Sequence, residues 1–202
     1  MTDDLFKNKY RIKSTRLQGW DYSRNGYYFV TICVKNRECA FGKIKDDEMV
    51  LSDIGKMTEQ CWRGIPEHFP FVKLDEFIIM PNHIHGIIVI AKDEDVDPAN
   101  VETHNVETHN YASLPQHENP NKFGPQSKNL ASIIRGFKVG VKKWATMNGI
   151  HFEWQPRFYD RIIRDEKELW NVRNYIRHNH LKWDEDKENP DINQGAKTRR
   201  HM

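Results

Sequence analysis

Two short runs rich in β-branched and aromatic residues stand next to each other near the middle of the chain. They read FVKLDEFIIM and HIHGIIVIA, and the turn-forming pair Pro81-Asn82 separates them. Runs of this length and composition are typical of buried β-strands. Two such strands joined by a short turn pair side by side, so we expect the chain to build a sheet around this hairpin.

The flanking sequence predicts further strands. The stretch GYYFVTICVKN (26–36) and the stretch PRFYDRIIR both have the composition of strands. Between the first of these and the central hairpin, AFGKIKDDEMVLS is typical of a second, shorter hairpin that turns at Asp46-Asp47. These segments and the central pair together supply the strands of a small sheet.

Apolar residues at spacings of three and four predict three helices. The first helix is expected to begin at Ser52 and to end at Pro66 and Pro70. The second is expected to begin after Ser127 and to stop near Gly149, and the third to begin at Asp165. The resulting order of strand, helix, strand, strand, helix, strand is the split βαβ pattern of ferredoxin-like folds. We therefore expect an α+β fold with an antiparallel sheet, helices on one face, the other face free, and an added C-terminal helix.

The chain is expected to form one domain over residues 1–183. Residues 92–126 are polar and contain the direct repeat VETHNVETHN, which cannot supply a packed core, so they are predicted to form an inserted surface loop. The histidines of this insert could bind a metal, although a solvated tract is favoured; they are His104, His109 and His117. Residues 184–202 are charged and are predicted to form a flexible tail.

Composition favours a cytoplasmic protein with no membrane partner. No run approaches the roughly 18 apolar residues of a membrane span, and no apolar signal segment is present near the first residue. Three cysteines without a C-x-x-C pair fit a reducing compartment. A net charge of +2 is too small to indicate a nucleic-acid partner by itself.

Two histidines share one face of the second central strand. His83 and His85 are separated by one residue, so their side chains point to the same side of the sheet. The pair alone is equally compatible with two hydrogen-bonded histidines beside a core. In the last helix Tyr175 and Asn179 stand four residues apart and share a helical face. A phenol and a carboxamide brought up to two imidazoles would place a nucleophile next to a metal site, whereas Tyr175 alone would fit a half-buried aromatic residue.

Three separated segments carry a family resemblance. FIIMPNHIHGIIVI, NLASIIRGFK and WQPRFYDRIIRDEKELWNVRNYIRHN closely resemble the single-tyrosine HUH transposases, most nearly the REP-associated tyrosine transposases of bacteria. HUH denotes His, a hydrophobic residue and His, which here are His83, Ile84 and His85. The resemblance covers about residues 22–183.

The resemblance implies an enzyme that cleaves and rejoins single-stranded DNA, often at hairpins, through a covalent 5′-phosphotyrosine. It makes Tyr175 the catalytic nucleophile and His83, His85 and Asn179 the ligands of Mg²⁺ or Mn²⁺. Members usually have Asn-Pro where this chain has Asn179-His180, so His180 is an alternative third ligand. Relatives act as monomers or homodimers, and both states stay open.

Basic residues predict where DNA would bind. The segment 128–148 holds five bases and no acid, and either a phosphate-binding face or a solvated one would explain it. The predicted DNA contacts are Arg135, Lys138, Lys142, Arg157 and Arg161. Trp154 and Tyr159 could stack on bases or pack in the core, and Tyr159 is a reserve nucleophile.

Three other functions keep the same sequence features. A single-stranded nucleic-acid-binding module would use the sheet without breaking a bond, although the aromatic pattern of RNA-recognition domains is absent. A catalytically idle descendant of a transposase would bind DNA only. A metal-dependent phosphoesterase that uses water would need the histidines but not Tyr175.

Overall fold

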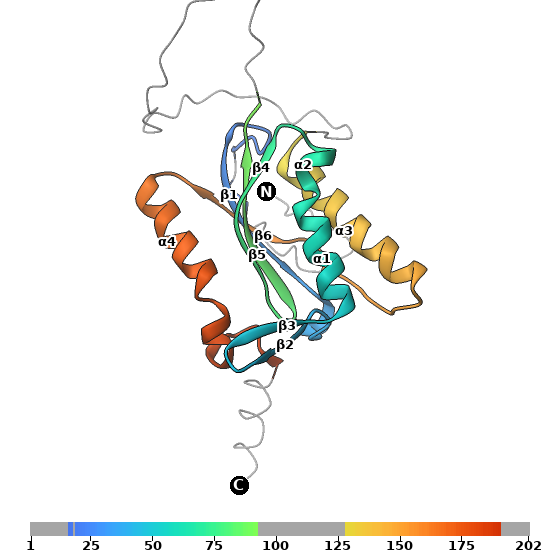
Figure 1. Ribbon diagram of the computed structural model, residues 1–202. Helices are drawn as coiled ribbons and strands as arrows, with labels where there is room; N and C mark the ends of the chain where they lie inside the picture. Colours follow the sequence, from blue (N-terminus) through green and yellow to red (C-terminus); the bar gives the residue numbers. More distant parts are fainter. Residues whose placement is uncertain (1–15, 18, 93–127, 191–202) are drawn as a thin grey trace, which may run out of the picture.

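The computed structural model describes residues 16–17, 19–92 and 128–190. Its centre is a four-stranded sheet in the order β4-β5-β1-β6, and every neighbouring pair is antiparallel (Figure 1). The strands are β1 (Gly26–Cys33), β4 (Val72–Ile79), β5 (His83–Ile90) and β6 (Tyr159–Ile163). The predicted α+β, ferredoxin-like arrangement is therefore confirmed, with β5 and β1 as the central strands.

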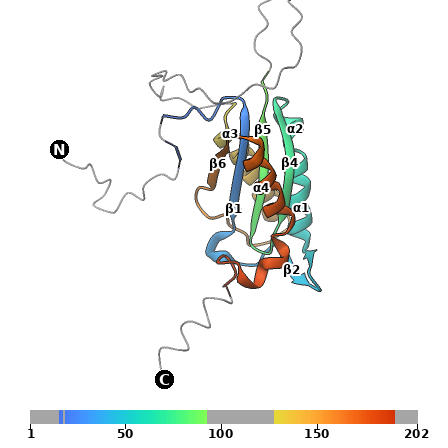
Figure 2. The same cartoon turned by 90° about the vertical axis from the view of Figure 1, so that its left-hand side faces the viewer.

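Helices cover both faces of this sheet. On one face lie α1 (Asp53–Arg63), the short α2 (Ile65–His68) and α3 (Leu130–Met147), while α4 (Glu166–Arg177) crosses the other face (Figures 1 and 2). The expectation of a free second face was wrong, because α4 folds back over it. The sheet thus separates α3 from α4.

The ends of the helices follow local side-chain chemistry. The Ser52 hydroxyl accepts a hydrogen bond from the amide of Gly55 at 3.1 Å, and the Asp165 carboxylate accepts one from the amide of Glu168 at 2.7 Å. Asn129 caps α3, and its side chain accepts a hydrogen bond from the amide of Ser132. Pro66 does not end α1; it lies in the first turn of α2, where a missing N–H costs nothing.

The predicted short hairpin is also present. It consists of β2 (Gly42–Lys45) and β3 (Glu48–Leu51), and Asp46 and Asp47 between them have positive φ angles of 51° and 60°. Such angles are the ones that a two-residue hairpin turn requires. A single-turn 3-10 helix, η2 (Lys35–Arg37), follows β1.

Alternation along β5 divides the buried side chains between two cores. Ile84 and Ile88 belong to the main core against α1 and α3, whereas Ile87 belongs to a smaller core under α4. Gly86 allows the close packing on the first side, since a Cβ there would lie 2.3 Å from a ring carbon of the buried Trp62. His83 and His85 point to the α4 side.

The folded chain continues beyond the expected end of the domain. After α4 it forms a 3-10 helix, η3 (His180–Glu185), and then runs back to Asn82, just before the start of β5. Within residues 184–190, at the start of the segment predicted to be a tail, Asn189 is buried and the carbonyl of Glu188 accepts a hydrogen bond from Asn82. The repeat-containing insert and residues 191–202 lie outside the described residues. Among those described, no helix has the length and apolarity that a membrane crossing needs.

Candidate metal and nucleophile site

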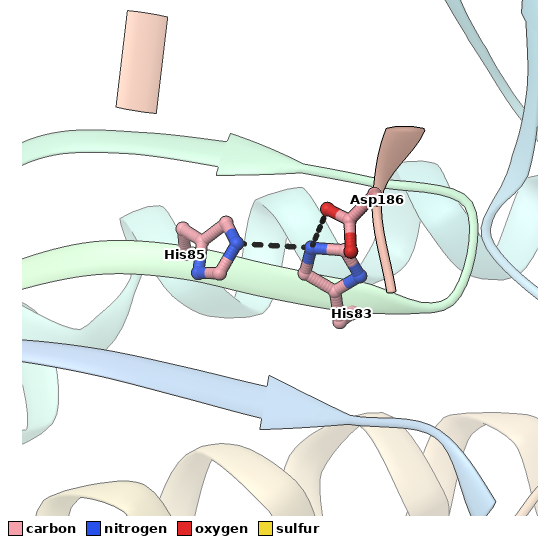
Figure 3. Close-up of side chains that lie close together, drawn as sticks. All are labelled: His83, His85 and Asp186. Carbon is pink, nitrogen blue, oxygen red and sulfur yellow. Dashed lines mark hydrogen bonds and ion pairs between the residues drawn. The ribbon is translucent and has the colours of Figure 1, made fainter. Parts of the chain in front are cut away.

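Two buried imidazoles face each other at the start of β5. Nε2 of His83 lies 3.0 Å from Nε2 of His85, and the two residues are 0% and 5% exposed (Figure 3). The strand places them on one face because Ile84 points to the opposite core. The pair lies on the sheet face that α4, the helix with Tyr175, covers.

The tautomer of His83 is set by its neighbour Asn82. The side-chain nitrogen of Asn82 donates to the carbonyls of Arg37 at 3.0 Å and Glu188 at 2.7 Å, which leaves the side-chain oxygen to face Nδ1 of His83 at 2.8 Å. Nδ1 of His83 must then carry the hydrogen and donate it. In the neutral imidazole, Nε2 of His83 then presents a lone pair to the site, which is the form that binds metals.

His85 is oriented from its other side. Its Nδ1 is hydrogen-bonded to the hydroxyl of Thr31 on β1 at 2.9 Å, and Thr31 is its register partner across the sheet. Its Nε2 lies 3.1 Å from the hydroxyl of Tyr175, which can donate to it. The same nitrogen therefore faces both His83 and the predicted nucleophile.

Burial keeps both imidazoles neutral. Loss of solvent lowers the pKa of His83 to about 4, although the carboxylate of Asp186 opposes this shift. Burial, followed by the neighbouring His83, lowers the pKa of His85 well below its usual value. At neutral pH the pair therefore offers nitrogen lone pairs rather than positive charges.

Asn179 supplies an oxygen to the same place. It lies between α4 and η3, is 4% exposed, and its side-chain oxygen is buried without a hydrogen-bond partner in the described chain. Its amide is close enough to influence the pKa values of both His83 and Tyr175. A buried, unpartnered amide oxygen beside two imidazole nitrogens fits a divalent cation, which accepts both donor types.

A carboxylate that sequence reasoning missed completes the cluster. Among the described residues, His83, His85 and Asp186 bring their ligand atoms within 4.8 Å of one another, and His180 is not in this group. Asp186 lies in the segment expected to be a flexible tail. Several acidic residues stand close together there, and no sequence pattern marks Asp186 among them as a candidate metal ligand. Only the return of the chain after η3 brings it to His83.

Tyr175 lies at the end of α4 above the histidines. Its ring packs edge-on against Phe29 with 6.0 Å between centroids, and the residue remains 48% exposed. Burial of the hydroxyl, followed by the nearby charge of Asp186, raises its pKa. The phenol is therefore a poor nucleophile until a cation lowers the cost of its ionisation.

Two arginines anchor α4 to the edge strand β4. Arg173 donates to both carboxylate oxygens of Asp75 at 2.9 and 2.5 Å, and Arg177 pairs with Glu76 one helical turn later. The register of β4 against β5 shifts between Leu74 and Phe77, at the position of these two acids. The pairs hold the tyrosine-bearing helix against the sheet of the same chain.

A groove of about 890 Å³ runs between β6 and α4 and reaches Tyr175. Its lining includes Phe29, the half-exposed Tyr159 and the basic side chains of Arg161, Arg164 and Lys167. Arg161 also forms an ion pair with Glu168 at 2.6 Å, with 60% of its own side chain exposed.

The other basic residues predicted to contact DNA lie elsewhere. Arg135, Lys138 and Lys142 are on α3, across the sheet from α4. Lys138 donates to the carbonyls of Gln155 and Arg157 at 2.9 and 2.6 Å, and Lys142 donates to a carbonyl of the same loop. The structure therefore does not bring these three residues together with Tyr175.

Trp154 packs in the core rather than on the surface. Its ring contacts those of Phe41, Phe137 and Phe152, and its indole N–H donates to the carbonyl of Lys138 at 3.0 Å. Of the two aromatic residues considered for base stacking, Tyr159 is thus the one that stays accessible.

Comparisons with known proteins agree with this geometry. The chain is 41% identical over 175 residues to an uncharacterized protein of Haemophilus influenzae, a match that covers 86% of this chain and 91% of that protein. It is 26% identical over 165 residues to a second protein of that organism, named "Putative REP-associated tyrosine transposase", covering 80% and 74% of the two chains. No family model matches the chain.

A solved structure has a similar fold. It is that of a REP-associated tyrosine transposase bound to a REP hairpin, with a TM-score of 0.50 and 19% identity over 87% of this chain and 73% of that one. The sheet, the paired histidines and the tyrosine on α4 are the features on which the resemblance to the single-tyrosine HUH transposases is based. The chain is thus similar in sequence to one protein named as a REP-associated tyrosine transposase and similar in fold to another.

Proposed function

We propose that the protein is a metal-dependent transposase that cleaves and rejoins single-stranded DNA by transesterification on Tyr175. The observation that carries the proposal is the position of the Tyr175 hydroxyl, 3.1 Å from a nitrogen of the buried His83–His85 pair. A nucleophile beside a set of neutral metal ligands is the arrangement that phosphodiester transfer needs.

The proposed cofactor is a divalent cation, Mg²⁺ or Mn²⁺. His83, His85 and Asn179 would hold it, because each has an unshared electron pair directed to the same small volume. Such a cation would neutralise charge on a non-bridging phosphate oxygen and favour ionisation of the phenol. Since two of the three donors are nitrogen, we expect Mn²⁺ to bind more tightly than Mg²⁺.

The protein's own residues account for the chemical step. The oxygen of Tyr175 attacks phosphorus, the bond from phosphorus to the 3′-oxygen breaks, and the released oxygen takes up a proton to become a 3′-hydroxyl. The 5′-phosphate stays bound to Tyr175, and attack by a 3′-hydroxyl reverses the step without ATP. Phe29 and the ion pairs of Arg173 and Arg177 orient the ring for this attack.

The groove between β6 and α4 is the proposed path of the unpaired strand. Tyr159 offers a ring on which a base can stack, while Arg161, Arg164 and Lys167 offer positive charge to phosphates. The similar solved structure contains a REP hairpin, which supports a hairpin-forming substrate for this chain as well. The proposed assembly is a monomer or a homodimer. The cytoplasm is the proposed location.

The test is a search for a covalent adduct. The protein is incubated with Mn²⁺ and end-labelled single-stranded hairpin oligonucleotides, and denaturing gels reveal any DNA that remains on the protein. The wild type and the matched control Tyr159→Phe should form the adduct, and Tyr175→Phe should not.

Other outcomes identify the alternatives. Cleavage without an adduct, unchanged in Tyr175→Phe, would mean that water is the nucleophile and the protein is a phosphoesterase. Tight binding with no cleavage of any hairpin by the wild type would favour a binding protein.

A further inference from the structure

Asp186 reaches the paired histidines from a separate part of the chain. Its Oδ2 lies 3.9 Å from Nε2 of His83, and its side chain is only 11% exposed (Figure 3). The residue follows η3. Two segments of the chain therefore contribute to the site: the end of α4 and the residues that follow it, with Tyr175 and Asn179, and the loop after η3 with Asp186. An acid so largely removed from solvent needs a compensating partner.

The carboxylate is held in place by its own loop. Its Oδ1 accepts a hydrogen bond from the amide of Glu188 at 2.7 Å, which leaves Oδ2 directed towards His83. The loop is fixed in turn by Asn82, which donates to the carbonyl of Glu188, and by Arg37, which donates to the carbonyl of Lys187 at 2.7 Å. Asn82 therefore orients His83 and anchors the loop of Asp186 at the same time.

The ligand atom of Asp186 lies close to those of both histidines. Among the described residues, one ligand atom each of His83, His85 and Asp186 lies within 4.8 Å of the other two. The side-chain oxygen of Asn179 is buried and has no hydrogen-bond partner in the described chain. A carboxylate, an amide oxygen and two imidazole nitrogens are donor types that a divalent cation accepts.

We propose that Asp186 is a fourth protein ligand of the divalent cation, and that it supplies the negative oxygen donor that lets this histidine site accept Mg²⁺ as well as softer metals. The inference rests on the proposed function, which places the cation between His83 and His85. It adds a ligand from the segment after η3.

Metal binding to the full-length protein without DNA tests this role. Isothermal titration with Mn²⁺, Mg²⁺ and Ni²⁺ is carried out on the wild type, Asp186→Asn and the control Asp184→Asn, which changes an exposed acid of the same segment. Asp186→Asn should weaken binding of Mn²⁺ and Mg²⁺ by at least about tenfold. Binding of Ni²⁺, which favours imidazole nitrogen, should change less, and Asp184→Asn should bind like the wild type.

Two results would overturn the inference. The first would leave the proposed metal site intact, and the second would contradict that site as well. If Asp186→Asn binds Mn²⁺ like the wild type while His83→Ala does not bind, Asp186 is no ligand and the metal site of the proposed function stands. If the wild type and His83→Ala are equally unable to bind any of the three metals, the metal site itself is absent. Thermal unfolding with chelator checks that each variant is folded.

Discussion

The hydroxyl of Tyr175 lies 3.1 Å from Nε2 of His85, although the two residues are ninety positions apart in the sequence. The contact joins the end of α4 to the middle of the sheet, and the same nitrogen is 3.0 Å from His83. The proposed nucleophile and the proposed pair of metal ligands thus meet at one atom. The stability and the chemistry of this junction can be tested separately.

The pH dependence of stability should reveal the buried imidazoles. In the metal-free protein the pKa of His83 is lowered from 6.5 to about 4 by burial, so the unfolded state takes up the proton first as the pH falls. Stability is then fully present above pH 6.5 and is lost between about pH 6.5 and pH 4, on the order of 1.4 kcal/mol for each pH unit crossed.

Chemical denaturation with chelator between pH 4 and 8 measures this loss. Excess Mn²⁺ should raise the stability and extend the loss below about pH 4 without reducing the slope, because a bound cation keeps the proton off the folded state only. The exposed-histidine control His151→Gln should keep the wild-type slope, and the double variant His83→Gln/His85→Gln should have a shallower one. A slope unaffected by the double variant would contradict the assignment of the loss to this pair.

Asn82 should govern metal affinity although it is no ligand in this account. Asn82→Ala removes the acceptor that holds the hydrogen on Nδ1 of His83 and leaves the carbonyls of Arg37 and Glu188 without their donor. We expect Mn²⁺ affinity to fall by about 10- to 100-fold. The control Asn148→Ala, at an exposed helix end, should bind like the wild type; equal affinities of all three proteins would refute the role of Asn82.

The ion pair of Arg173 and Asp75 should affect catalysis more than stability. Because the pair is partly exposed, Arg173→Ala should cost about 1 kcal/mol in the free energy of unfolding. Misplacement of Tyr175 should reduce the cleavage rate by at least about tenfold. The charge exchange Asp75→Arg/Arg173→Asp should restore part of the rate.

Arg63→Ala is the matched control for this pair. It removes an ion pair with Glu59 on α1, on the opposite face of the sheet, and should leave cleavage unchanged. A similar rate loss in Arg63→Ala and Arg173→Ala would mean that general destabilisation, rather than the position of α4, explains the effect.

Tyr159 should contribute to the binding of single strands. Its ring is 46% exposed and lines the groove that leads to Tyr175. Tyr159→Ala should weaken binding of a single-stranded oligonucleotide by about 1 to 3 kcal/mol if one base stacks on the ring. Fluorescence anisotropy measures this, and Trp170→Ala removes another exposed ring as a control. Equal losses in both variants would argue against a specific stacking site.

Much of the fold could be predicted because it depends on local signals. The alternation of β5 placed His83 and His85 on one face, and Ser52 and Asp165 capped helices as expected. The turn at Asp46-Asp47 followed from its polar residues between two short apolar runs. These features depend on a few neighbouring residues, so they can be read without knowing the tertiary structure.

The rest depends on how distant segments pack. The helix α4 covers the second sheet face because its apolar side meets Phe29 and Ile87, and no local pattern specifies which face a helix will choose. In the sequence nothing distinguishes Asp186 from the acidic residues around it. Its place beside His83 follows only from the path of the loop after η3. Lys138 similarly resembles a surface base in the sequence, but it binds two backbone carbonyls.

Mass spectrometry of the peptide that stays linked to DNA tests the central claim most directly. The wild-type protein is trapped with Mn²⁺ and a hairpin oligonucleotide, digested with protease and nuclease, and searched for the peptide that carries a nucleotide. The account predicts a 5′-phosphate linkage on Tyr175 that disappears in His83→Ala. Linkage to Tyr159 or another residue, or full linkage in His83→Ala with chelator present, would contradict it.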